Sequence, residues 1–298
     1  MIGLEDYKPL SLADRALFED YFTRFPQTHT EYLFTGLVAW AHYTQVYYTV
    51  RDGCLLIMNM KDGKPQLRAP VGPRNDALLG DVFDLAKREG EKKALIALDE
   101  PAKEWIGALY PNARIQEDRD FYDYVYSAKS LAELPGKPYL TQRNRLNRFR
   151  RKYEYSVELI CSEKKENVGE YMKRWCDARD CEDHEMLEQE KKAIMYCMEH
   201  FYELSLSGIV IKIDGVIQAL SVWERLNKDT AAIHFEKGMP GYEGIYPAVN
   251  NETAKILAKD YKYINRESDL GIPGLRTAKE RLHPDHMVPL YYIDRGGL

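Results

Sequence analysis

The sequence predicts an α/β protein made of two similar domains, each a mixed sheet with helices packed against it. Three observations support this prediction. The chain has 298 residues, roughly twice the usual length of one domain. Strand and helix patterns start again in a similar order after residue 140, which indicates a second unit of the same kind. The hydrophobic content of 45% is enough for two cores.

The first half opens with a helical pattern and continues with strands. Residues 12–24 carry apolar side chains at helical spacing. Two runs rich in β-branched and aromatic residues then end at the turn signals Asp52-Gly53 and Asp62-Gly63. The expected elements are a helix at 12–24, strands at 46–53 and 54–63, a helix at 76–89, a strand at 94–98, a helix at 101–111 and a strand at 120–127.

Residues 131–140 read as a linker, because they contain two prolines and a glycine. We therefore place the domains at residues 1–135 and 136–298. Asp214-Gly215 marks the clearest hairpin of the second half. The elements expected there are a basic helix at 141–152, a strand at 155–160, two helices within 166–206, a hairpin at 208–226, a strand at 230–237, a helix at 248–260, a strand at 261–267, a helix at 275–282 and a strand at 288–293.

Charge and cysteine usage indicate where the protein works. The net charge of -5 argues against a protein that coats nucleic acid, although it allows a local basic patch. The five cysteines are scattered without the spacing of a disulfide framework. The N-terminal MIGLEDYKPL lacks the pattern of a signal peptide, and no apolar run is long enough for a membrane span. We expect a cytoplasmic protein without a transmembrane segment.

One strand carries a candidate acid/base pair. In the strand at 230–237, alternation places His234 and Glu236 on one face and Ile233 on the other. A histidine and a glutamate on one face of a central strand suit proton transfer. The alternative is a strand face whose His and Glu are simply solvated.

The glycines of the following loop suit an anionic ligand. Gly238, Gly241 and Gly244 lead from that strand into a helix, and glycines together with a helix N-terminus favour phosphate groups. The spacing matches neither a P-loop nor the dinucleotide fingerprint. A plain strand-to-helix turn is the alternative.

A polar cluster follows the strand at 261–267. The segment NRESDLGIPGLR contains Asn265, Arg266, Glu267, Gly271, Gly274 and Arg276. Ligands of open α/β sheets gather at the carboxyl ends of strands. Arg276, Lys279 and His283 recur at spacings of three and four and are expected on one helix face. The cluster therefore predicts an anion site, with a capped surface helix as the alternative.

The run TQRNRLNRFRRKY is a basic patch in an acidic chain. Arg143, Arg145, Arg148 and Arg151 are our candidates for RNA contact. The alternative is a solvated helix face. Cys176, Cys181 and His184 do not match the usual zinc spacings, so we expect no metal, and no Gly-x-Ser-x-Gly element points to a serine hydrolase.

The residues of the C-terminal half resemble a known family. The stretches HFEKG and YKYINRESDLGIPGLRTAKERLHP look like the signature of a bacterial family related to the soluble C-terminal domain of phosphatidylglycerol lysyltransferases. PVGPRND, DRDFYDYVYSAKSLAELPGK and QRNRLNRF extend the resemblance over nearly the whole chain. The family is similar to Fem-type aminoacyl transferases, which implies two tandem GNAT-like acyltransferase domains.

The resemblance implies an acyl or aminoacyl transferase acting on an amine or hydroxyl of a small molecule, peptide or lipid. Glu236, His234 and Glu267 would then be catalytic, while Arg276 and Lys279 would hold the donor's phosphate. The donor would be charged tRNA or acyl-CoA, with no covalently bound cofactor. The acetyltransferase pyrophosphate pattern is absent, because GMPGYEG follows Lys237. An acyl-CoA-dependent N-acyltransferase is one alternative, and a non-catalytic RNA-binding or regulatory module on the same fold is another.

Overall fold

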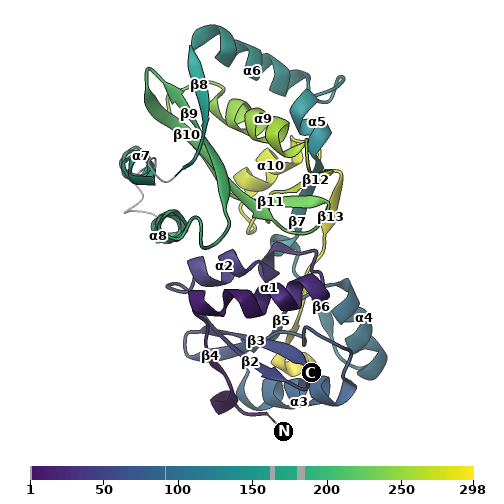
Figure 1. The fold of residues 1–298 in the computed structure, drawn as a ribbon. Coiled ribbons are helices and arrows are strands. Elements are labelled where there is room, and N and C mark those ends of the chain that lie inside the picture. The colour runs from purple at the N-terminus through teal and green to yellow at the C-terminus, as the bar shows by residue number, and fades with distance from the viewer. Residues whose placement is uncertain (1, 91, 162–164, 180–184) are drawn as a thin grey trace. The chain divides into compact units, whose positions relative to one another are not determined.

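The computed structural model describes residues 2–90, 92–161, 165–179 and 185–298. It divides into two compact units, residues 1–122 with 288–298 and residues 123–287 (Figure 1). Each unit is a mixed sheet with helices on both faces, so the predicted fold class is confirmed. None of the described helices is long and apolar enough to cross a membrane.

The described strands of the first unit form a seven-stranded sheet in the order β1-β2-β3-β4-β5-β14-β6. Leu56 and Met58 pack with α3 and α4 on one face, and Phe18 of α1 packs against Tyr48 on the other. The elements are β1 (Lys8–Pro9), α1 (Arg15–Arg24), α2 (Phe34–Ala39), β2 (Gln45–Arg51), β3 (Cys54–Lys61), β4 (Lys64–Leu67), α3 (Asp76–Glu89), β5 (Lys93–Leu98), α4 (Glu100–Leu109), β6 (Ile115–Glu117) and β14 (Tyr291–Asp294).

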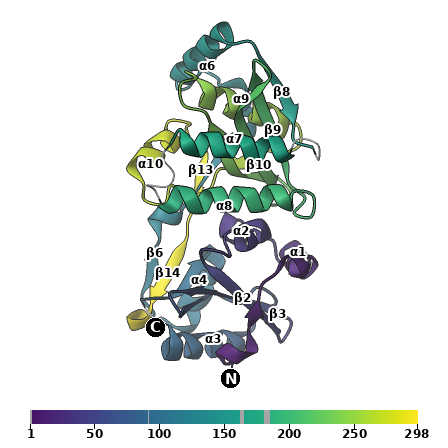
Figure 2. The same ribbon diagram turned by 90° about the vertical axis from the view of Figure 1, so that its left-hand side faces the viewer.

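The described strands of the second unit form a sheet in the order β13-β7-β12-β11-β10-β9-β8. Helices α5, α6 and α9 cover one face and α7 and α8 the other, as the two views show (Figures 1 and 2). The elements are β7 (Asp123–Ser127), α5 (Ala128–Glu133), α6 (Leu140–Lys152), β8 (Tyr155–Leu159), α7 (Lys165–Asp177), α8 (Glu185–Glu199), β9 (Ser207–Ile213), β10 (Val216–Arg225), β11 (Thr230–Gly238), α9 (Ile245–Leu257), β12 (Tyr263–Asn265), α10 (Pro273–Glu280) and β13 (His286–Val288).

The three Asp-Gly turns predicted from the sequence join neighbouring antiparallel strands. At Asp52-Gly53, Asp62-Gly63 and Asp214-Gly215 both residues have positive φ, as a two-residue hairpin turn requires. Local chemistry decides such turns, because few residues other than glycine, asparagine and aspartate tolerate this backbone.

Two strands lie in the other sheet from the one that the sequence order suggested. β7, expected to close the first half, pairs with β12 of the second sheet. β14, the last strand of the chain, lies between β5 and β6 of the first sheet. The units therefore divide after Tyr122, whereas the sequence analysis placed the boundary at residue 135. Part of the expected linker is also helical, since α5 continues to Glu133.

Candidate active site

The sheet of the second unit opens between β11 and β12. These parallel strands pair over only a short stretch, and their last pair is Ala232 opposite Asn265. β12 ends there, whereas β11 continues to Gly238. Glu267 then adopts a left-handed backbone with φ of 57°, which turns the chain away from β11. The carboxyl ends of two parallel strands thus border one opening, the usual position of a ligand in such sheets.

His234 of β11 lies between two carboxylates. Its Nε2 is 2.6 Å from Glu224 Oε1 and its Nδ1 is 2.8 Å from Glu267 Oε1. Burial alone would lower the pKa of His234, but the hydrogen bonds and charges of Glu224 and Glu267 outweigh burial and raise this pKa to about 10. The imidazole is therefore charged near neutral pH and has no free lone pair. In this state it fixes Glu267 instead of accepting a proton.

Glu236, two residues further along β11, pairs with Arg266. Arg266 Nη2 donates to Glu236 Oε1 at 2.8 Å, and the two side chains are 14% and 6% exposed. Glu236 Oε2 and Arg266 Nη1 are buried and have no hydrogen-bond partner. Ser221 lies directly opposite Glu236 on β10, and its buried Oγ is also unpaired. Unpaired buried polar atoms are costly, and these belong to three residues that are neighbours across the strands or by a hydrogen bond, so they point to a site that receives a polar group.

Asn265 holds the end of β12 in place. Its Nδ2 donates to Asp123 Oδ2 of β7 at 2.8 Å, and its Oδ1 accepts from the backbone N–H of Glu267 at 2.8 Å. The side chain is fully buried. Asn265 thus connects β7 to the turn that carries Glu267, and these two hydrogen bonds hold that turn in place beside the opening.

The guanidinium of Arg276 in α10 is bound to a carboxylate of the protein, that of Asp269. Its Nε and Nη2 donate to the two carboxylate oxygens of Asp269 at 2.8 and 2.9 Å. Tyr124 and the Gly271 N–H also donate to Asp269. Burial would raise the pKa of Asp269, but these hydrogen bonds, led by those of Arg276, hold it well below its usual range. The guanidinium is a third exposed, so it retains some access to solvent.

Lys279 lies inside the unit. Its ammonium donates to the carbonyl oxygens of Arg266 and Glu267. Burial, helped by the charge of Arg266, lowers the pKa of Lys279 to about 8. The predicted common face of Arg276, Lys279 and His283 is wrong for His283, because α10 ends at Glu280 and His283 has a left-handed backbone.

The predicted glycines are explained by packing around the start of α9. A side chain on Gly238 would lie 2.7 Å from Ile245 Cγ2, and one on Gly244 would lie 2.7 Å from the Arg145 carbonyl oxygen. Gly241 and Gly244 also have positive φ. Gly271, which precedes α10, has a φ of 71°, whereas Gly274 in the first turn of α10 has open space around it.

The comparisons with known proteins identify the family. A model described as "Phosphatidylglycerol lysyltransferase, C-terminal" matches residues 22–294. The chain belongs to this family. No curated protein matches it.

Solved structures agree with the fold. A conserved protein of unknown function from Bacteroides thetaiotaomicron VPI-5482 is 28% identical, with a TM-score of 0.90 over 97% of this chain and 98% of that one. L-PGS from Bacillus licheniformis is 13% identical, with a TM-score of 0.64 over 95% and 92% of the two chains. FemX is 10% identical, with a TM-score of 0.58 over 96% and 97%. The last two show the fold, and they confirm the predicted tandem GNAT-like architecture.

In this family member the basic helix α6 is partly used for internal contacts. Arg143 donates to the carbonyl oxygens of Leu134 and Gly136, and Arg148 pairs with Glu243. Arg145 and Arg151 are exposed. Of the four arginines predicted to contact RNA, Arg143 and Arg148 are thus bonded to the protein, whereas Arg145 and Arg151 are accessible.

Several residues of the opening were not singled out from the sequence. The contact of Glu224 with His234 was not predicted, because a β-bulge between Val222 and Trp223 shifts the register of β10 against β11. Alternation along one strand cannot reveal a bulge. Asp123 and Ser221 reach the site from other strands, so only the sheet order brings them there. The described residues include no cluster suited to a metal ion; Cys181 and His184 lie outside them.

Proposed function

We propose that this chain transfers an activated aminoacyl group, with charged tRNA as the donor, onto an amine or hydroxyl acceptor. The observation that supports this most is the buried Glu236–Arg266 pair, which presents an unpaired carboxylate oxygen and an unpaired guanidinium nitrogen at the opening of the sheet. A reaction that releases a proton and develops an oxyanion needs groups of these two kinds. The family assignment agrees with transfer chemistry.

In the proposed reaction the acceptor nitrogen or oxygen attacks the acyl carbonyl carbon of the donor ester. Glu236 Oε2 takes the proton that the attacking group loses. Arg266 Nη1 donates to the oxyanion of the tetrahedral intermediate. The carbonyl then re-forms as the ester C–O bond breaks, and the proton held by Glu236 passes to the departing ribose oxygen. One amide or ester bond forms, one ester bond breaks, and no oxidant or reductant is required.

Other residues of the site are assigned positions around this pair. Glu267 is 37% exposed and is fixed by His234, so it suits a substrate ammonium group. Asn265, Lys279 and Arg276 would act as positioning residues, because each is bonded to the backbone or to a carboxylate of the strands that form the opening.

The start of α9 favours RNA over CoA as the donor. In the first turn, the Ile245 N–H donates to the Tyr242 carbonyl oxygen, and Pro247 has no N–H. A helix N-terminus binds pyrophosphate through free N–H groups, and this one retains few of them. The accessible Arg145 and Arg151 of α6 offer an alternative contact for an RNA backbone.

The test uses tRNA carrying a labelled amino acid, incubated with the full chain and a panel of amines and hydroxyl compounds. We expect label to move to an acceptor, and Glu236→Gln to lower the rate roughly 100-fold or more, as loss of a general base does. Glu267→Gln serves as the matched variant and should raise KM more than it lowers kcat. Thermal unfolding of each variant shows whether it is folded.

Three results would contradict the proposal. An unchanged transfer rate in Glu236→Gln would show that Glu236 is not the general base. Stabilisation by acyl-CoA but not by charged tRNA, followed by turnover of acyl-CoA, would favour the acyl-CoA N-acyltransferase. Salt-sensitive RNA binding without turnover of any donor would favour a non-catalytic RNA-binding module.

A further inference from the structure

A pocket lies on the surface of the second unit, and its lining includes none of the residues assigned above to transfer. Its volume is about 500 Å³. It forms where the segment before α6 meets the segment after α10. The lining residues are Pro138, Thr141, Gln142, Arg145, Arg281 and His283. The described lining carries two positive charges and no carboxylate, so the pocket suits an anion.

The two arginines of the pocket are available to a ligand. The guanidinium groups of Arg145 and Arg281 form no hydrogen bond or ion pair with any described residue. The pKa of Glu243 is lowered chiefly by its hydrogen bond with Arg148 and to a smaller extent by the charge of Arg145. The ion pair of this carboxylate is with Arg148. Elsewhere in this unit, arginines such as Arg266 are bonded to the protein. Two exposed guanidiniums that line one pocket and have no carboxylate partner there attract an anion.

His283 is held in the pocket wall by several contacts. Its Nε2 donates to the Pro138 carbonyl oxygen at 3.0 Å, and its ring lies edge-on to Tyr139 with 5.1 Å between centroids. Tyr139 in turn donates to the Leu282 carbonyl oxygen at 3.2 Å. The left-handed backbone of His283, with φ of 55°, costs roughly 1 kcal/mol or more for a residue other than glycine. These contacts fix the imidazole and give the pocket a defined shape.

The first turn of α6 adds to the attraction for an anion. Its N-cap, Tyr139, makes no capping hydrogen bond with its side chain, and the turn contains no acidic residue. The helix dipole places a partial positive charge there. This contribution supports the two arginines, whose charges carry most of the argument.

From this geometry we infer that the pocket binds a phosphate group. Two guanidiniums, a hydroxyl and an amide provide more donors than the two oxygens of a carboxylate can accept, whereas the oxygens of a phosphate match them. The pocket has room for a ligand larger than a phosphate alone. The phosphate can belong to an RNA backbone or to a small phosphorylated compound. This binding site does not depend on the proposed transfer reaction.

The experiment compares two double variants of the full chain. Arg145→Gln/Arg281→Gln removes both pocket charges. Lys228→Gln/Lys259→Gln removes the same number of charges from exposed positions outside both the pocket and α6. Binding of a labelled RNA acceptor-stem hairpin is measured by fluorescence anisotropy at several salt concentrations. Thermal unfolding is measured with and without inorganic pyrophosphate and ADP.

If the pocket binds an RNA phosphate, the pocket variant binds the hairpin at least 10-fold more weakly than the control variant. The slope of the logarithm of its binding constant against the logarithm of salt concentration also falls in magnitude by about 1 to 2. If the pocket binds a small phosphorylated compound, pyrophosphate or ADP raises the Tm of the unaltered chain and of the control, but not of the pocket variant. Equal hairpin binding by the two variants, with no Tm shift by either compound, overturns the inference. None of these measurements uses transfer activity, so failure of the transfer reaction is distinguished from failure of the pocket.

Discussion

At the residue scale, the charged ring of His234 connects two carboxylates at the opening of the sheet, those of Glu224 and Glu267. Its ring bridges Glu224 of β10 and Glu267 after β12, while the side chain is only 5% exposed. A charged imidazole in this position neutralises one of the two carboxylates and orients the other. The arrangement therefore keeps Glu267 in one place at the edge of the opening, and it depends on the protonation of His234.

The charge of His234 predicts how stability changes with pH. The folded-state pKa is raised to about 10, above the usual value of about 6.5. The stabilising contribution is therefore complete below pH 6.5 and is lost as the pH rises toward 10. We expect the difference in unfolding free energy between the unaltered chain and His234→Gln to be largest near pH 6 and to shrink by pH 10, measured by urea unfolding.

Nitrogen NMR of the imidazole checks the same prediction directly. The signal that disappears in His234→Gln is assigned to His234, and it should keep the shifts of a doubly protonated ring at pH 8. A ring that is neutral at pH 8, or a stability difference that grows with pH, would contradict the charged bridge.

The sequence pointed to His234 and Glu236 through alternation, which is a local property of one strand. The structure interrupts that alternation, because Val222 lies opposite Phe235 and Trp223 lies opposite Ile233, which leaves His234 as an extra residue of β11. Spacing could not show that Lys279 is buried, since its ammonium donates to carbonyl oxygens of the turn after β12, more than ten residues earlier in the chain. Nor could it place Glu224, which depends on a bulge.

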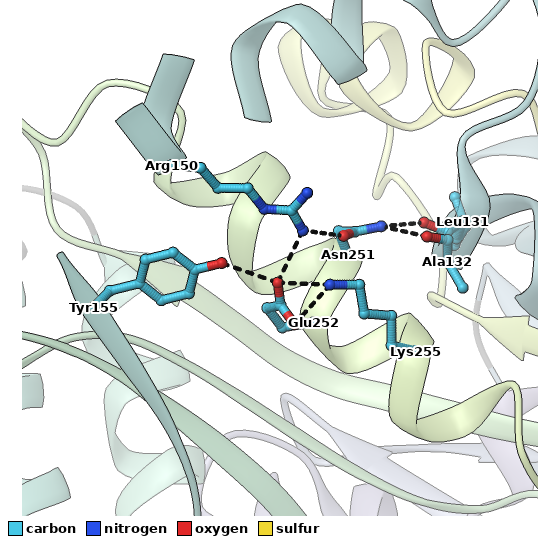
Figure 3. Close-up of polar contacts among 7 residues, drawn as sticks. All are labelled: Leu131, Ala132, Arg150, Tyr155, Asn251, Glu252 and Lys255. Atoms are coloured by element: carbon cyan, nitrogen blue, oxygen red, sulfur yellow. Dashed lines mark hydrogen bonds and ion pairs between the residues drawn. The ribbon is translucent and has the colours of Figure 1, made fainter. Parts of the chain in front are cut away.

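At the scale of elements, a polar network joins α6 to α9, α5 and β8 (Figure 3). Asn251 of α9 donates to the carbonyl oxygens of Leu131 and Ala132 near the end of α5 and accepts from Arg150. Glu252 binds Arg150 and the Tyr155 hydroxyl, each at 3.0 Å. The network fixes the rotation of α6 and thereby decides which of its arginines face outward.

Asn251→Ala tests how much this network stabilises the unit. Asn251 is 2% exposed, so the substitution leaves the carbonyl oxygens of Leu131 and Ala132 without this donor and removes one of the two acceptors of Arg150. We expect a loss of roughly 2–3 kcal/mol in the free energy of unfolding, measured by urea unfolding. Lys255→Ala is the control: its ammonium is 44% exposed and pairs with Glu252, so the loss should stay within about 1 kcal/mol. Equal losses would show that Asn251 is not the residue that connects these helices.

At the scale of the whole molecule, the two sheets are built on one plan. β4 lies parallel to β5 as β11 lies parallel to β12, and a helix, α3 or α9, connects each of these pairs. The strand next to β5 is β14, and the strand next to β12 is β7. Each half of the chain thus gives its last strand to the other sheet. Local patterns found both strands, but no local pattern states which sheet a strand joins.

At the corresponding place in the first unit, the structure describes an arginine whose guanidinium is paired. Arg68 follows the pair Leu67–Leu95 and is 1% exposed. Its guanidinium donates to the Glu31 carbonyl oxygen at 2.6 Å and to Asn59 Oδ1 at 3.1 Å, and it lies over the ring of Tyr32. A satisfied arginine at this place stabilises the unit, so the unpaired Glu236 and Arg266 atoms remain the better candidates for chemistry.

The shared strands predict which fragments fold alone. A fragment of residues 123–287 keeps β7, whose Tyr124 and Tyr126 are buried in the core, and we expect it to unfold cooperatively in urea. A fragment of residues 136–298, cut at the boundary suggested by the sequence, lacks β7 and leaves β12 without its neighbour. The backbone groups of β12 and a core cavity are then exposed, a loss comparable to the roughly 5–15 kcal/mol that stabilises a typical domain.

By the same argument, residues 1–122 lack β14 between β5 and β6, and a separate peptide of residues 288–298 should restore their fold. Circular dichroism and urea unfolding of each fragment, with and without the peptide, provide the measurement. A peptide with Ile293→Asp, which replaces a fully buried side chain, is the matched control and should not restore the fold. If residues 136–298 are as stable as 123–287, or if 1–122 folds without the peptide, the exchanged strands do not hold their sheets together. If the predictions hold, each unit can fold only after both halves of the chain are available, because each sheet needs a strand from the other half.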